Sequence, residues 1–284
     1  MIDPAAAAGA IAAHSAKSAS ESSLKKSEQT HGAYLEAMKD TPEFKRAVSL
    51  RAQRLEVKEG ALNWLSRPLF WLSARQQKYF AETFPAELAE KMVRVEVDDM
   101  VQPDANVGVQ AVEGLSYSLD YPELKDMYLR LIATASDQSR KDDAHPGFAS
   151  IIRQLSPREA VRLPDFLNIE YHGAIANVTL TNPDGGQRFL ERHVPSVNDD
   201  TTGSMVIEPD MASMVDNWSR LGLVITSYDS WSPDADAYEF METRPEYLRW
   251  KAEYAGDDDL RVGIQPGIVY PTDFGRQFNR AVLK

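Results

Sequence analysis

Two stretches in the middle of the chain carry apolar residues with the spacing of an amphipathic helix. Positions i, i+3, i+4 and i+7 are Leu124, Met127, Tyr128 and Leu131 in the first stretch, and Phe148, Ile151, Ile152 and Leu155 in the second. In an α-helix this spacing places the apolar side chains on one face. The pattern therefore predicts two amphipathic helices.

Polar and proline residues mark where these helices and a third one begin. Asp120 is expected to open the first helix, with Pro122 in its first turn, and Pro146 lies just inside the start of the second. The sequence Ser156-Pro157-Arg158-Glu159 is a capping box, in which the serine accepts from the N3 amide and the glutamate bonds to the cap amide. It predicts a third helix, which Pro164 is expected to end or bend early.

The N-terminal part of the chain shows two different patterns. Residues 1–30 are rich in Ala and Ser and have almost no large apolar side chains, so they cannot bury enough surface to offset the entropy of ordering. We expect a disordered or frayed tail there. From about residue 34 to 84 the pattern becomes helical, with an aromatic segment that contains Trp64, Phe70 and Trp71.

The C-terminal part begins with a strand pattern and continues with a helix. Residues 174–181 and 187–194 flank the turn sequence Asn182-Pro183-Asp184-Gly185-Gly186, which predicts a β-hairpin. An apolar helical face follows at residues 211–221. Gly222 comes directly after it and suits the position that ends a helix.

The last strands and helices are predicted from the same kinds of apolar pattern and capping residue. Residues 223–225 and 262–270 have strand patterns, and a helix is expected between them, from about residue 244 to 254. Thr272 is expected to be the N-cap of the last helix.

Together these elements predict a mainly α protein with a smaller α+β part. We expect a helical domain at residues 31–155 and a second domain at 156–284, with the boundary at the tight joint before the third helix. In the second domain, the order of helix, strand, strand and closing helix is typical of a winged-helix fold, here with insertions. The second domain is therefore expected to be a winged-helix-like α+β domain.

The charge balance favours a protein partner or self-association over nucleic acid. The chain has 31 Lys and Arg against 43 Asp and Glu, a net charge of -12, which repels phosphate groups. The predicted helix at 208–221 illustrates this, since it has three acidic residues and only Arg220 as a base. DNA binding through this helix is therefore disfavoured.

Other features of the composition bear on location. The sequence contains no Cys, which excludes disulfides, zinc–thiolate sites and thiol nucleophiles and suits a reducing cytoplasm. No stretch approaches the roughly 20 apolar residues that span a bilayer, and the first residues lack the basic segment of a secretory signal. We expect a cytoplasmic protein, with peripheral membrane contact by the aromatic segment as the weaker alternative.

His145 is the residue whose position most suggests a function. It begins the sequence His145-Pro146-Gly147-Phe148, and a histidine at a helix start can titrate near neutral pH or order the junction before the helix. The other histidines lack metal-ligand spacing, and the paired aspartates fall in predicted loops. The sequence predicts no metal, no cofactor and no catalytic set; an enzyme would need an acid–histidine pocket assembled from distant residues.

Residues 62–160 resemble the abortive infection alpha (Abi-alpha) family of bacterial phage-defence proteins. The resemblance depends on ordered motifs: Leu62-Asn63-Trp64-Leu65, Glu123-Leu124, Met127-Tyr128, Leu131-Ile132-Ala133, His145-Pro146-Gly147-Phe148 and Ile151-Ile152-Arg153-Gln154-Leu155-Ser156-Pro157. Two further motifs, at 218–224 and 272–278, resemble the C-terminal half of that family. The resemblance implies a role in phage defence and supplies no established active site.

We therefore expect a phage-defence protein that acts through protein contacts and is not an enzyme. The candidate interaction or junction residues are His145, Pro146, Phe148, Trp64, Phe70 and Trp71. The alternative is a winged-helix transcriptional regulator that binds DNA.

Overall fold

The computed structural model describes residues 73–197 and 205–284, except Ala235. The chain divides into two units, each described separately below. Unit 1 contains the described residues up to Pro157 together with Arg280–Lys284, and unit 2 is Arg158–Asn279. The predicted tail at residues 1–30 lies outside the described residues. The described part is a mixed α+β protein, as the sequence predicted.

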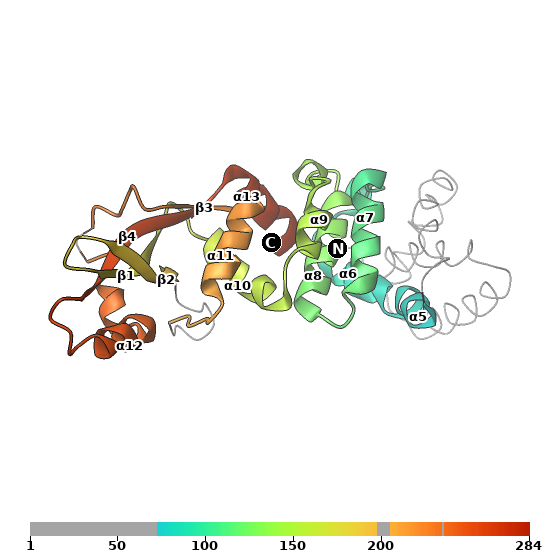
Figure 1. The fold of residues 1–284 in the computed structure, drawn as a ribbon. Coiled ribbons are helices and arrows are strands. Elements are labelled where there is room, and N and C mark those ends of the chain that lie inside the picture. The colour runs from blue at the N-terminus through green and yellow to red at the C-terminus, as the bar shows by residue number, and fades with distance from the viewer. Residues whose placement is uncertain (1–72, 198–204, 235) are drawn as a thin grey trace. The chain divides into compact units, whose positions relative to one another are not determined.

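Unit 1 is helical (Figure 1). Its α-helices are α5 (Ala74–Glu82), α6 (Phe84–Lys91), α7 (Ala105–Tyr117), α8 (Pro122–Ala135) and α9 (Phe148–Arg153). Helix α8 packs against α6, α7 and α9, and the residues of its predicted apolar face are buried. Both helices predicted in this region are present, but α9 is shorter than predicted: Pro146 precedes it instead of lying inside its start, and Leu155 follows it.

Helices α7 and α8 approach closely because α7 has a glycine at the contact. A Cβ atom at Gly114 would lie 2.3 Å from the ring of Tyr128, so a larger residue there would push the ring away. Tyr128 is buried, and its hydroxyl donates a hydrogen bond of 3.1 Å to the carbonyl of Ala149. Burial raises the pKa of Tyr128 to about 12, so the hydroxyl remains a donor.

The start of α8 differs from the prediction. Tyr121, without a side-chain cap, precedes the helix, and Pro122 occupies the first turn. The carboxylate of Asp120 instead forms an ion pair with Arg75 of α5. Proline already supplies the backbone geometry of the first helical position, and the amide that it lacks would have no partner within the helix.

The end of the chain returns to unit 1. A π-helical turn, Asn279–Leu283, places Ala281 and Val282 in buried positions. The hydroxyl of Thr134 donates to the carbonyl of Ala281 at 3.0 Å, and Arg280 pairs with Asp143 at 2.9 Å. The helical core of unit 1 therefore includes residues that follow unit 2 in sequence.

The described residues of unit 2 form four α-helices and one antiparallel sheet. The helices are α10 (Pro157–Leu167), α11 (Met211–Arg220), α12 (Pro245–Glu253) and α13 (Asp273–Phe278), and the strands are β1 (Gly173–Thr181), β2 (Gln187–Pro195), β3 (Val224–Ser227) and β4 (Arg261–Pro271). The strand order is β2-β1-β4-β3. The hairpin, the three later helices and both later strands were predicted, and these predictions are confirmed.

Pro164 was predicted to end or bend α10 early, and the helix does not end there. The helix continues to Leu167, and the amide of Asn168 still bonds to the carbonyl of Pro164 at 3.0 Å. Leu163, Phe166 and Leu167 are buried on the same helix. Burial of these side chains offsets the backbone hydrogen bond that proline cannot make.

Hydrophobic contacts in unit 2 join helices to one another and to the sheet. Phe166 of α10 packs against Trp218 of α11 with ring centroids 4.9 Å apart. A second cluster lies between the sheet and α12, and its buried residues are Ala176, Val178, Val194, Met241 and Tyr247. Figure 1 shows α12 beside β1 and β2, away from the other helices of this unit. The second cluster therefore holds α12 against β1 and β2.

The junction between β4 and α13 depends on a small residue. Thr272 is the predicted N-cap, and its Oγ1 accepts a hydrogen bond of 2.7 Å from the amide of Gly275. A Cβ atom at Gly275 would lie 2.0 Å from the carbonyl oxygen of Leu223, which is backbone and cannot rotate away. Glycine at 275 is therefore needed for α13 to pack against the start of β3.

We expect Gly275→Ala to lower the free energy of unfolding by about 2 kcal/mol, because overpacking against backbone forces a shift of α13. Urea unfolding followed by tryptophan fluorescence measures this change. Gly256→Ala is the matched control, since no atom lies within 4 Å of its Cβ position. Equal stability of the two variants would contradict the packing argument.

Candidate functional site

The residues predicted around His145 lie at the start of α9. His145 and Pro146 are exposed, whereas Phe148 is fully buried at 0% exposure. The ring Nδ1 of His145 accepts a hydrogen bond of 3.0 Å from the amide of Gly147, and the ring lies 5.5 Å from that of Phe148. His145 thus orders the turn before α9, and only His145 and Pro146 present a surface to a partner.

The other predicted residues cannot be placed. Trp64, Phe70 and Trp71 lie outside the described residues, so their role stays a prediction.

A different site is found in unit 2, where the pairing of β1 and β2 slips twice. Val178 lies opposite Glu191 and Ala176 opposite Val194, so Asn177 faces two residues, Arg192 and His193. At this bulge His193 has a φ of 56°, a left-handed conformation that is uncommon for residues other than glycine. The bulge redirects the side chain of His193.

Asn177 holds the bulge in place. Its Oδ1 accepts a hydrogen bond of 3.0 Å from the amide of His193, and its Nδ2 donates to Oε1 of Gln265 on β4 at 3.0 Å. Asn177 is 3% exposed. The side chain therefore satisfies a backbone amide that the slipped strand pairing leaves without a strand partner.

The side chain of His193 is buried among polar groups from three parts of unit 2. Its Nδ1 lies 2.7 Å from the hydroxyl of Tyr228, which follows β3, and its Nε2 lies 3.2 Å from Oδ1 of Asp216 on α11. Nη2 of Arg192 lies 3.1 Å from the same Nε2, and Arg192 also pairs with Asp216 at 3.4 Å. We call these four residues the His193 cluster.

Burial and the neighbouring charges determine the protonation of the His193 cluster. Burial lowers the pKa of His193, the positive charge of Arg192 lowers it further, and Asp216 opposes both. Burial also raises the pKa of the Tyr228 hydroxyl above its ordinary value. Near neutral pH the cluster thus favours a neutral imidazole and a protonated tyrosine.

The order hydroxyl, imidazole and carboxylate is also found in nucleophilic catalytic triads. Here the hydroxyl belongs to a tyrosine with a raised pKa, which disfavours the reactive anion. Arg192 can only donate to Nε2, whereas Asp216 can only accept from it, so these neighbours compete for one ring nitrogen. This arrangement suits a structural link between β2, α11 and the segment after β3.

A pocket of about 430 Å³ adjoins the His193 cluster. It lies between β2, the residues that precede and begin α11, and the start of α12. Its charged lining residues are Glu191, Arg192, Glu208, Arg244, Glu246 and Arg249, and its apolar ones include Ile207, Pro209 and Met211. The volume falls in the range of small-ligand sites, and the lining is unusually rich in charge. Within the described ranges, no three His, Cys, Asp or Glu side chains form a group that could hold a metal ion.

The His193 cluster was not predicted from the sequence. Asp216 and Tyr228 lie 23 and 35 positions from His193 in the sequence, and only the fold brings the three residues together. A local signal was not available, because the left-handed conformation of His193 results from the strand slippage.

The fold and the site thus define a mixed α+β protein with a helical unit and a unit that contains a buried histidine cluster. The sequence profile described as abortive infection alpha matches residues 76–282, which is most of the chain. The chain therefore belongs to the abortive infection alpha family, and the predicted resemblance is confirmed. Searches of curated proteins and of solved structures gave no match. No helix within the described residues is long and apolar enough to cross a membrane.

The lowered pKa of His193 makes a testable contribution to stability. The unfolded chain binds the proton more readily than the folded one, so this contribution is present above the ordinary histidine pKa of about 6.5 and is lost as the pH falls below it. We expect the free energy of unfolding to fall between pH 7 and pH 5, and His193→Asn to remove part of this slope. Asparagine is chosen because it tolerates the left-handed conformation.

Urea unfolding at a series of pH values measures the slope. The wild type measured in the same buffers is the reference. A slope unchanged by His193→Asn would contradict the assignment.

Proposed function

We propose that this protein takes part in abortive phage defence by binding another protein, in the cytoplasm and without catalysing a reaction. The main support for this proposal is that residues 76–282 match the abortive infection alpha family. The net charge of -12 and the absence of Cys from the sequence support a protein partner and a reducing compartment.

The internal contacts of the His193 cluster support a role other than catalysis. His193 is 4% exposed on its side chain, and its ring nitrogens already contact Tyr228, Asp216 and Arg192. A general base needs a substrate proton within hydrogen-bond reach. In this cluster the neighbouring residues of the protein occupy that position.

We further infer that unit 2 is a winged-helix-like module with insertions. Helix α11 directly precedes β3, β3 pairs with β4, and α13 closes the unit. The insertions are the segments at about 174–208, which contains β1 and β2, and 229–260, which contains α12. This reading does not favour DNA, because the exposed Asp216 and Asp210 would face phosphates and the charge of the whole chain repels them.

Expression of the full chain in a phage-sensitive bacterial host should reduce plaque number against at least one phage of a broad panel. Tyr228→Phe should protect as well as the wild type, because it removes only the hydroxyl, on which a catalytic His193–Tyr228 pair would depend. Immunoblotting checks that both proteins accumulate equally. Loss of protection with Tyr228→Phe at equal protein level would indicate catalysis, and no protection by the wild type would overturn the defence role.

A mobility-shift experiment tests the alternative of DNA binding. The full chain at micromolar concentration should leave labelled duplex DNA unshifted at low salt, where phosphate contacts are strongest. A shift that salt abolishes would favour a regulator.

A further inference from the structure

One ring nitrogen of His193 has two neighbours of opposite hydrogen-bonding character. Its Nε2 lies 3.2 Å from Oδ1 of Asp216 and 3.1 Å from Nη2 of Arg192. A carboxylate can only accept a hydrogen bond, and a guanidinium can only donate one. Nε2 therefore bonds to Asp216 only when it carries a proton, and to Arg192 only when it does not.

The other ring nitrogen has a neighbour that suits both protonation states. Nδ1 of His193 lies 2.7 Å from the hydroxyl of Tyr228, and the two ring centroids are 5.8 Å apart. A hydroxyl oxygen accepts from an Nδ1–H group whether the imidazole is neutral or charged. With the first proton on Nδ1, the second proton goes to Nε2. Tyr228 thus keeps one bond to the ring while Nε2 changes its partner.

The ring of His193 is enclosed, whereas Arg192 is free to turn toward solvent. The side chain of His193 is 4% exposed, and the side chains of Arg192 and Asp216 are 48% and 53% exposed. The two contacts between Arg192 and Asp216 are both 3.4 Å long. An exposed ion pair contributes little to stability, so the bond to Nε2 is the contact that holds the guanidinium against the ring.

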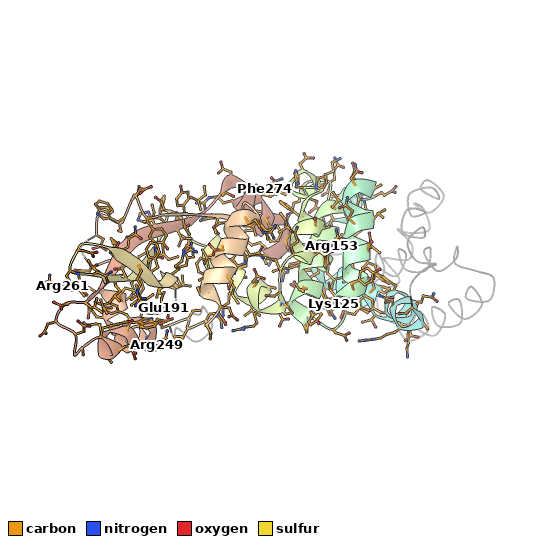
Figure 2. The ribbon with its side chains drawn as sticks, in the orientation of Figure 1. Lys125, Arg153, Glu191, Arg249, Arg261 and Phe274 are labelled. Carbon is orange, nitrogen blue, oxygen red and sulfur yellow. The ribbon has the colours of Figure 1, made fainter. Side chains whose placement is uncertain are left out.

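Among the described residues, three elements bring a charged or titratable group to the ring: β2, α11 and the segment after β3, with Arg192, Asp216 and Tyr228. From β1, Asn177 bonds to the backbone of His193, and Gln265 of β4 bonds to Asn177; neither is charged. Glu191 precedes Arg192 in β2 and pairs with Arg249 of α12, and both are labelled in Figure 2. Proton uptake by His193 is therefore opposed by one cation and favoured by one carboxylate.

We propose that the His193 cluster is a proton-operated switch in which Arg192 is the moving part. In the neutral state Nε2 accepts a hydrogen bond from Arg192. A proton taken from water then forms an N–H bond at Nε2, which donates to Asp216, and the Arg192 guanidinium turns into solvent. It is expelled because two N–H groups and two positive charges would otherwise face each other at 3.1 Å.

The switch changes the wall of the adjoining pocket. Arg192 is one of its lining residues, so the release of Arg192 moves a positive charge on that wall. This device goes beyond the proposed defence role and does not depend on it.

The switch operates as the pH falls. Burial lowers the pKa of His193, Arg192 lowers it further and Asp216 opposes both. We therefore expect Arg192 to be released below the ordinary histidine pKa of about 6.5.

The test is an NMR titration of the nitrogen-15-labelled full chain from pH 8 to pH 5. The ring nitrogen shifts of His193 show which nitrogen carries a proton, and the heteronuclear NOE of Arg192 Nε shows whether its guanidinium is held. Spectra of His193→Asn and Arg192→Lys assign the two sets of signals. At pH 8 we expect a proton on Nδ1 alone and a rigid Arg192. As Nε2 takes up its proton, Arg192 should become mobile with the same midpoint.

Two variants and one internal reference make the titration specific. Asp216→Asn should move both midpoints about one pH unit lower, because it removes the charge that favours the imidazolium. His172→Asn is the matched control: it replaces an exposed histidine outside the cluster and should leave both midpoints unchanged. Arg244, whose side chain is 1% exposed and bonds to Glu246, should stay rigid throughout.

A proton on Nε2 at pH 8 would overturn the proposal, because Asp216 would then be the partner in both states. An Arg192 that stays rigid after His193 is charged would also overturn it. The same holds for unfolding before His193 takes up its second proton, since no folded charged state would then exist. The wild-type titration gives these answers even if Asp216→Asn does not fold. No phage is used, so the defence role is judged by the plaque assay alone.

Discussion

The site in unit 2 depends on one side chain, that of Asn177, which stabilises the first of two one-residue slips in the pairing of β1 with β2. Its amide group bonds to the backbone of His193 on one side and to Gln265 on the other. Without these bonds the amide of His193 would be buried with no hydrogen-bond acceptor. The free-energy cost of such an unpaired donor is comparable to the loss of a hydrogen bond. The left-handed backbone at His193, and through it the contacts to α11 and Tyr228, follows from this arrangement.

Most of the helices and strands could be predicted from the sequence because their signals are local. The i, i+3, i+4, i+7 spacing of Leu124–Leu131 and the cap at Thr272 both describe interactions between neighbours along the chain. Asp120 and Pro164 were misjudged because each depends on a more distant element: Asp120 pairs with Arg75 of α5, and the turn that contains Pro164 is held by buried apolar residues. The winged-helix reading and the partner class remain predictions.

The His193 cluster could not be predicted for a specific reason. Two bulges in β2 shift the pairing by two residues, and a shift of two preserves the alternation of inward and outward side chains. Leu190 and Val194 both contact the cluster beneath α12, and a separation of four residues is also the spacing of one face of a regular strand. These apolar positions of β2 therefore do not reveal the slips.

The placement of residues 280–284 in unit 1 has a consequence for the order in which the protein forms on the ribosome. Ala281 and Val282 are core residues of unit 1, yet they are synthesised after the whole of unit 2. Domains generally fold as units during translation, N-terminal parts first. Here the unit that begins to emerge first is completed only after unit 2, because its core waits for residues 280–284.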